Sequence, residues 1–206
     1  MIIVISAPSG TGKTTIIERL LACFPNLTYS VSVSTREKRK GEVEGRDYVF
    51  VGVEEFLKKV EREEFAEWAE VHGNYYGTPK NLLQNSLLCG KDVLLDVNVQ
   101  GGLQLKKGYG KEVLLIFIIP PSLEELKRRL LNRKTESEEA IKRRLLMAEE
   151  ELKYLLNYDY FVVNKKVADT VKEISTIIRA ERCKVERIPK ELLISLKINK
   201  RGDTEK

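Results

Sequence analysis

The chain has 206 residues, of which 42% are hydrophobic and 33% are charged, and its formal net charge is +5. That apolar content is sufficient for a buried core and argues against a disordered chain. The longest uninterrupted apolar run has seven residues (113–119), whereas a membrane-spanning helix needs ~18 or more. The start of the chain lacks the basic segment of a signal peptide. Its three cysteines have neither disulfide nor metal-binding spacing, so we expect a cytoplasmic protein.

The positive charge is mild and unevenly placed. Residues 184–206 hold seven Lys/Arg and four Asp/Glu, a net +3, which leaves only +2 for the rest of the chain. Nucleic-acid binding usually needs a concentrated basic face, while a small anionic substrate needs less. We therefore expect no nucleic-acid partner and no membrane partner.

The first half of the chain begins with an apolar, β-branched strand at residues 1–6, followed by a Gly-rich turn and a helix to about residue 23. A strand is predicted at 27–34, a basic loop up to 46, and a short strand at 47–51. Residues 54–71 are rich in Glu and predict a helix in two pieces. A turn at 73–79 and a helix at 80–88 follow.

In the second half, residues 92–97 and 113–119 are apolar runs typical of buried parallel strands. Ser122 with Glu125, and Thr135 with Glu138, are capping-box pairs that each open a helix, the second reaching about residue 156. A strand at 160–164 and a helix at 167–182 complete the pattern. Strands that alternate with helices predict a mostly parallel α/β sheet, with the small strands between residues 30 and 80 as an insertion at one edge.

The Gly-rich turn is the strongest functional signal. It lies directly between a strand and a helix and reads Ala7-Pro8-Ser9-Gly10-Thr11-Gly12-Lys13-Thr14-Thr15. Such a P-loop wraps phosphate oxygens with backbone N–H groups at a helix N-terminus. The lysine reaches the β- and γ-phosphates, and the following Thr14 hydroxyl ligates Mg²⁺. The segment therefore predicts an ATP-binding site, with Ala7 in place of the usual first glycine.

A carboxylate follows the apolar run 93–95. Asp96 would point into the crevice at the carboxyl end of a parallel sheet, where ligands bind. It can hold Mg²⁺ through water, or it can be a solvated acid at a strand end. Asn98, two residues later, would face the same side.

The loop at 32–42 holds four basic residues in five positions, preceded by hydroxyl groups. Arginines grip phosphate bidentately, but an exposed charged loop explains the segment equally well. The hydroxyl groups of Tyr48, Tyr75 and Tyr76 are candidate hydrogen-bond donors to a phosphate group. No pattern singles out Glu67 among its acidic neighbours, which we expect on a solvated helix face. His72 is the only histidine, so no Ser-His-Asp or histidine-metal site is available.

A second basic stretch covers residues 127–144. Four of its eight basic residues have acidic partners four positions earlier, an arrangement typical of solvent-facing pairs. Arg133 and Arg144 have no such partner. An arginine-bearing segment of this kind stabilises the charge on a transferring phosphoryl group; the alternative is a plain pair of basic helices.

Several segments resemble guanylate kinases when they are taken together and in order. The resemblance covers residues 1 to about 182. Beyond the P-loop, it rests on Ser30-Val31-Ser32-Val33-Ser34-Thr35-Arg36 with Arg39, Gly41-Glu42, Gly45-Arg46-Asp47-Tyr48, Glu67-Trp68-Ala69, Gly73-Asn74-Tyr75-Tyr76-Gly77-Thr78, Leu95-Asp96-Val97, Arg129-Leu130, Arg133 and Arg144-Leu145.

This resemblance implies a P-loop NTPase-type, three-layer α/β core with a parallel sheet, a small mixed α+β GMP-binding insertion at about 34–80, and a helical lid at about 122–145. It implies transfer of phosphate from ATP to GMP or dGMP with Mg²⁺. Residues 183–206 would be a basic C-terminal extension outside the resemblance, either an added edge strand or a docking tail.

The family's residue roles carry over to matching positions. Arg36, Arg39, Tyr48 and Tyr76 would bind the GMP phosphate, and Ser32, Glu67, Thr78 and Asp96 would recognise guanine. Lys13, Arg133 and Arg144, with Arg36, would be catalytic, while Arg129 and Asn164 would lie near the adenine of ATP. Asn98 replaces a second acid of the family, and Lys134 and Lys165-Lys166 replace glycine and acidic positions in and near the lid.

Three rival interpretations differ in testable ways. A protein-binding module of the same fold typically loses the P-loop lysine or the lid arginines, and both are present here. A P-loop kinase with another acceptor would not depend on Glu67. A nucleic-acid-binding protein would bind duplexes in a salt-dependent manner.

Overall fold

The computed structural model describes residues 1–71, 73–131 and 138–198. Within these residues, five parallel strands form a central sheet in the order β2-β7-β1-β8-β9. The strands are β1 (Ile2–Ser6), β2 (Leu27–Tyr29), β7 (Asp92–Asp96), β8 (Val113–Ile119) and β9 (Tyr160–Val163). The predicted parallel α/β core is confirmed.

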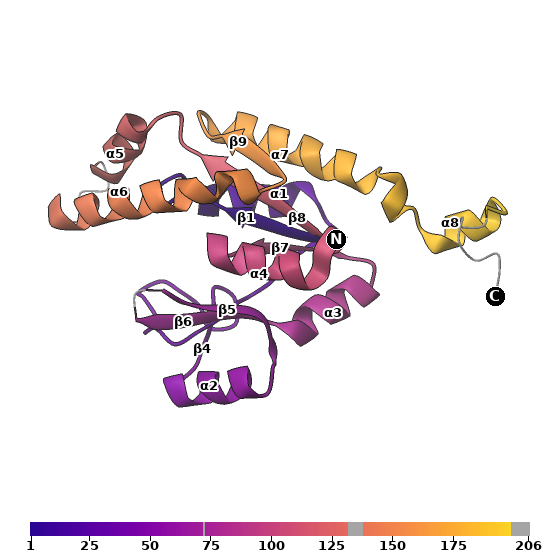
Figure 1. The fold of residues 1–206 in the computed structure, drawn as a ribbon, viewed down its shortest axis with the longest axis horizontal. Coiled ribbons are helices and arrows are strands. Elements are labelled where there is room, and N and C mark those ends of the chain that lie inside the picture. Colours follow the sequence, from indigo (N-terminus) through magenta and orange to yellow (C-terminus); the bar gives the residue numbers. More distant parts are fainter. Residues whose placement is uncertain (72, 132–137, 199–206) are drawn as a thin grey trace.

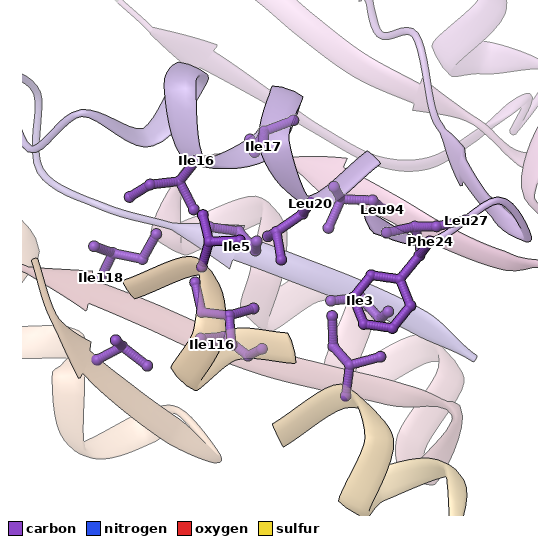
Figure 2. Close-up of a cluster of buried hydrophobic side chains, with 14 of the residues drawn as sticks. Ile3, Ile5, Ile16, Ile17, Leu20, Phe24, Leu27, Leu94, Ile116 and Ile118 are labelled. Carbon is purple, nitrogen blue, oxygen red and sulfur yellow. The ribbon is translucent and has the colours of Figure 1, made fainter. Parts of the chain in front are cut away.

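Helices cover both faces of this sheet. Ile3 and Ile5 of β1 pack with α1 (Lys13–Cys23) and α7 (Val167–Arg182), as Figure 2 shows for the α1 side. The alternate residues Ile2 and Val4 pack on the other face with α3 (Lys80–Leu88) and α4 (Val99–Tyr109). Burial of both faces explains the unbroken apolar strands, because each buried isoleucine stabilises the fold by roughly 1.5–3 kcal/mol.

A second, smaller sheet lies on one side of the core, and helices α5 (Leu123–Leu131) and α6 (Glu138–Leu152) lie on the opposite side (Figure 1). Among the described residues, the strand order of this smaller sheet is β4-β3-β6-β5, and its strand pairs are partly parallel and partly antiparallel. The strands are β3 (Val33–Ser34), β4 (Val49–Phe50), β5 (Phe65–Val71) and β6 (Asn74–Pro79). Helix α2 (Val53–Glu61) packs on them through Phe56, whose ring stacks on Phe65 at 4.5 Å.

The prediction of helix for all of 54–71 is wrong. Helix α2 ends at Glu61, and residues 65–71 form β5, which pairs with β6 where a turn was predicted. Buried side chains alternate along β5 at Phe65, Glu67 and Ala69. A glutamate at an inward position concealed this two-residue period. The single strand predicted at 27–34 is also wrong, because β2 and β3 belong to different sheets.

Helix α4 (Val99–Tyr109) was not predicted from the sequence, because its glycines have a low helix propensity. Asn98 caps it: its side-chain oxygen accepts the N–H of Gly101 at 2.8 Å. The glycines allow close packing, since a Cβ on Gly102 would lie 3.0 Å from the Tyr158 hydroxyl. Packing against the sheet therefore compensates for the weak helix propensity of this segment.

Two helices, α5 (Leu123–Leu131) and α6 (Glu138–Leu152), pack together through Leu126, Leu130, Ile141 and Ala148. The predicted cap of α5 is confirmed, because the Glu125 N–H donates to Ser122 Oγ at 3.1 Å. The cap predicted at Thr135 lies outside the described residues. The predicted helix to residue 156 ends earlier as an α-helix, and Lys153–Asn157 forms a 3₁₀ turn.

Beyond α7, the short helix α8 (Lys190–Ser195) lies away from the core (Figure 1). Because these residues form a helix, they do not form the added edge strand that was one of the two expectations for residues 183–206. No helix in the described ranges is long and apolar enough to cross a membrane.

Candidate active site

A cavity of about 490 Å³ brings together most of the predicted site residues. It opens at the carboxyl ends of β1 and β7, the position where parallel sheets bind ligands. Its lining includes three groups from distant parts of the chain. They are the P-loop (Ser9, Gly10, Thr11, Gly12, Lys13, Thr14, Thr15), the small-sheet region (Ser32, Arg36, Arg39, Tyr48, Glu67, Tyr76), and Asp96 with Arg144.

The P-loop adopts a conformation that depends on glycine. Gly10 and Gly12 have φ of 90° and 95°, which side-chain-bearing residues rarely adopt. A Cβ on Gly10 would also lie 2.7 Å from Leu130 Cδ2, so α5 packs directly against the loop. Thr11 of the same loop is buried, and its hydroxyl donates to the Pro8 carbonyl at 2.6 Å.

Arg129 and Asn164 brace the P-loop from behind. Asn164 is buried, and its side-chain N–H donates to the Thr11 carbonyl at 2.6 Å while its oxygen accepts from Thr170 at 3.0 Å. Arg129 donates to the Asn164 carbonyl at 2.9 Å and to the Thr11 carbonyl at 3.4 Å. Both lie outside the set of residues that line the cavity. Their expected place near adenine therefore stays a prediction.

Lys13 forms an ion pair with Asp96, and both residues line the cavity. The parallel register that pairs Ile5 with Asp96 places this carboxylate beside the start of the P-loop. Thr14 and Asp96 present hydroxyl and carboxylate oxygens, the ligand type that Mg²⁺ takes when substrate phosphates and water complete its shell. These residues fit a magnesium ion. Asn98 uses its side-chain oxygen to cap α4.

Glu67 is a buried carboxylate at the edge of the cavity, with 5% of its surface exposed. Thr78, also buried, donates its hydroxyl to Glu67 Oε1 at 2.6 Å. Burial raises the pKa of Glu67 from 4.5 to about 7, and the Thr78 hydrogen bond opposes this rise. Gly101 of α4 directly approaches the second carboxylate oxygen, leaving no room for a side chain. The result is a hydrogen-bond acceptor held in a fixed position.

Arg36 is held rigidly at the cavity wall. Its guanidinium donates to both oxygens of Glu42, at 2.5 and 2.8 Å. It also lies over the rings of Tyr48 at 4.8 Å and Phe50 at 5.4 Å. This pairing lowers the pKa of Glu42 to about 2. Glu42 has no role in the expectations from sequence, although it belongs to the Gly41-Glu42 motif.

The two adjacent tyrosines of β6 point to opposite sides of the small sheet. Tyr76 lines the cavity, with its ring 6.0 Å from that of Tyr48. Tyr75 stacks instead on Phe56 at 5.5 Å, in the core of the small sheet. Both tyrosines of β6 were candidate hydrogen-bond donors to a phosphate group, and the structure brings only Tyr76 to the site.

One face of α6 forms the remaining wall. Arg144, Met147 and Glu151 line the cavity, and the spacing of three and four residues places them on one side of the helix. Arg144 donates to Ser9 Oγ at 3.4 Å. Arg133 lies outside the described residues. Sequence reasoning missed Glu151, although its position two turns after Arg144 was a usable signal.

These features define a P-loop kinase that acts on a small phosphorylated acceptor, because a phosphate-binding loop and a second arginine- and tyrosine-lined site share one cavity. The guanylate kinase family profile matches residues 1–181. Guanylate kinase from Clostridium tetani is 49% identical over 95% of this chain and 93% of its own length. The enzyme from Thermotoga maritima is 47% identical over 89% of this chain and 88% of its own.

A solved structure gives the same result. The crystal structure of guanylate kinase from Anaplasma phagocytophilum superposes with a TM-score of 0.79 at 40% identity, covering 95% of this chain and 94% of that one. The chain belongs to the guanylate kinase family. Members of this family phosphorylate GMP with ATP, which confirms the predicted enzyme class and does not favour a silent binding module.

Proposed function

We propose that the protein transfers the γ-phosphoryl group of ATP to GMP and dGMP with Mg²⁺, within guanine nucleotide recycling in the cytoplasm. The observation that carries the acceptor assignment is the buried Glu67 carboxylate in the same cavity as Lys13. The three cysteines are free and exposed, which suits a reducing compartment. We propose no nucleic-acid or membrane partner.

Glu67 can select guanine over adenine in the acceptor nucleotide through its hydrogen-bonding chemistry. Guanine presents N1–H and N2–H₂ donors, and an ionised carboxylate only accepts hydrogen bonds. Adenine presents an acceptor at N1, which the carboxylate would repel. Thr78 orients the carboxylate, and Ser32 and Asp96, which line the same cavity, would complete the base site. Unpaired buried groups can discriminate by about 10⁴ or more.

For the acceptor phosphate, Arg36 and Arg39 supply positive charge, and Tyr48 and Tyr76 supply hydroxyl donors. Because Glu42 and two aromatic rings already hold Arg36, little side-chain entropy is lost when it binds phosphate. This preorganisation keeps the acceptor oxygen in place for in-line attack.

For the transferring group, Lys13 leaves Asp96 and pairs with the β- and γ-phosphates, while the loop N–H groups bind the remaining oxygens. Magnesium, held by Thr14 and through water by Asp96, would neutralise phosphate charge. Arg144 stands at the rim, next to Ser9, where it can stabilise charge that develops in transfer. Arg133 has the same expected role. Residues 1–182 form this catalytic unit, with 183–206 as an extension of unassigned role.

The test is formation of ADP from MgATP with GMP, dGMP, AMP, CMP and UMP offered separately. We expect turnover with GMP and dGMP alone. Turnover with another acceptor would contradict the guanine assignment but keep the phosphoryl-transfer machinery. A folded protein that binds GMP without any turnover would refute catalysis.

A further inference from the structure

Helix α4 of the core and strand β5 of the smaller sheet are joined through the side chain of Gln104. Its oxygen accepts the backbone N–H of Trp68 at 3.3 Å, and its N–H₂ group donates to the Trp68 carbonyl at 3.0 Å. Both backbone groups of Trp68 therefore pair with one amide, as they would with a neighbouring strand. In the described part of the smaller sheet, β5 is the last strand, so this contact covers backbone groups at a sheet edge.

The contact lies next to the carboxylate that is proposed to select the base. Trp68 directly follows Glu67 in β5. Gly101, one turn before Gln104 on the same face of α4, approaches the second carboxylate oxygen of Glu67 so closely that a Cβ would collide with it. Helix α4 thus meets two consecutive residues of β5, the side chain of Glu67 through Gly101 and the main chain of Trp68 through Gln104.

We propose that Gln104 is a positioning residue for the acceptor base: its amide fastens β5 to α4, and thereby holds the Glu67 carboxylate in a fixed place relative to the core. The inference rests on the proposed use of GMP as the acceptor. Gln104 is exposed and lies outside the set of residues that line the cavity. It therefore acts through the strand that carries Glu67, and not by touching the nucleotide.

Helix α4 can serve as a fixed reference because the core holds it independently of the smaller sheet. Leu105 is buried together with Val4 of β1, the strand that leads into the P-loop. Lys106 donates to the Val113 carbonyl, at the start of β8, at 2.8 Å and to the Asp159 carboxylate at 2.7 Å. A strand that is fastened to α4 is therefore also placed relative to the P-loop.

The division of the site between two sheets makes such a link necessary. Glu67, Arg36 and Tyr76 come from the region of the smaller sheet, whereas Lys13 and Asp96 belong to the core. If β5 moved away from α4, water would reach the buried carboxylate and the hydrogen bonds to the base would weaken. Apolar contacts between the two parts resist this movement without fixing a direction, while the paired hydrogen bonds of Gln104 are directional.

The first experiment measures steady-state kinetics at pH 8 with MgATP and GMP. Gln104→Met keeps the length of the side chain and removes both hydrogen-bonding groups. We expect the KM for GMP to rise about fivefold, with kcat and the KM for ATP changed less than about twofold, because binding of the base is weakened. The matched control is Lys107→Met, an exposed change one turn further along α4, and it should have no effect.

A second variant tests the hydrogen bonds themselves. Gln104→Glu keeps one oxygen for the Trp68 N–H but places the other carboxylate oxygen against the Trp68 carbonyl, so the KM for GMP should rise at least as much as in Gln104→Met. An unchanged KM for GMP in both variants would overturn the proposal. An equal rise of the KM values for GMP and ATP would also overturn it, because it would indicate a general disturbance of α4.

A double-mutant cycle asks whether Gln104 acts through Glu67. A residue that positions Glu67 loses most of its effect when the carboxylate is absent. Adding Gln104→Met to Glu67→Gln should therefore lower kcat/KM for GMP by less than about twofold, against about fivefold in the wild-type background. A merely structural role would give the same fivefold loss in both backgrounds and would refute the positioning role.

Measurements without turnover separate this proposal from the proposed function. In the nucleotide-free protein, Gln104→Met should speed amide hydrogen exchange at Trp68 about fivefold, and Lys107→Met should leave it unchanged. Trp68 is the only tryptophan of the chain, so its fluorescence can follow GMP binding, which we expect Gln104→Met to weaken about fivefold. Unchanged exchange, or faster exchange with unchanged GMP binding, would overturn the proposal. A wild-type protein that binds GMP without turnover would refute the kinase function, while weaker binding in Gln104→Met would still support the positioning role.

Discussion

Replacing Glu67 by Gln should raise the free energy of unfolding of the nucleotide-free protein and lower kcat/KM for GMP. The buried negative charge of Glu67 destabilises the folded protein, but guanine needs it as a hydrogen-bond acceptor. Glu67 has a pKa of about 7 against an ordinary value of 4.5. Between these values the folded chain holds a proton that the unfolded chain has lost, so stability falls as the pH rises. At about 1.36 kcal/mol per pH unit, the penalty above pH 7 is about 3 kcal/mol.

The uncharged amide of Gln removes this penalty, but its N–H₂ group introduces a smaller free-energy cost of its own. Its oxygen can still accept from Thr78, as Glu67 Oε1 does at 2.6 Å. Its new N–H₂ group requires a partner in a buried place, which costs ~1 kcal/mol. We therefore expect Glu67→Gln to raise the free energy of unfolding of the nucleotide-free protein by about 2 kcal/mol at pH 8, and to bring no gain at pH 5.

Urea unfolding at pH 5 and pH 8 measures this difference. Glu70→Gln, an exposed change on the same strand, is the control and should be neutral at both values. The kinetic counterpart is a fall of kcat/KM for GMP by about 10²–10³, since a charged acceptor for guanine is lost. The wild-type KM for GMP should also rise as the pH falls below 7, and this dependence should vanish in the variant. A Gln variant destabilised equally at both pH values would refute the argument.

Two other substitutions probe the phosphate loop and the base site. Lys13→Ala should lower kcat by several orders of magnitude, because the β- and γ-phosphates lose their cation, while circular dichroism shows an intact fold; a wild-type rate would contradict the P-loop mechanism. Gly101→Ala would force a methyl group against the Glu67 carboxylate, so we expect the KM for GMP to rise about tenfold or more with the KM for ATP nearly unchanged. Equal shifts in both KM values would point to a general disturbance of α4.

Local patterns were sufficient for much of this protein. The apolar run at residues 2–6, the glycines at 10 and 12 and the following Lys-Thr specify strand, loop and helix within fifteen residues, and the structure has them in that order. Parallel strands buried on both faces leave the same continuous apolar mark wherever they occur, as at β7 and β8. The order of motifs was specific enough to indicate the family.

The small sheet and α4 were not visible in this way. Strand β5 carries Glu67 at an inward position. The surroundings of its buried carboxylate are formed by Thr78 of β6 and Gly101 of α4, which are distant in the sequence. Helix α4 contains glycines that weaken a helix alone but fit close to Tyr158. Local propensity contradicts the structure at these places because tertiary packing and function outweigh it.

The sequence by itself therefore determined the core, the P-loop and the kind of chemistry, since each depends on residues that are neighbours in the chain. Tertiary structure alone decided which polar and charged groups of the site contact one another. The pairs Lys13 with Asp96, Arg144 with Ser9, and Asn164 with Thr11 join positions that are 83 to 153 residues apart. Such contacts leave no periodic trace in the sequence, because they form only once the central sheet and α6 have folded against the P-loop and the start of α1.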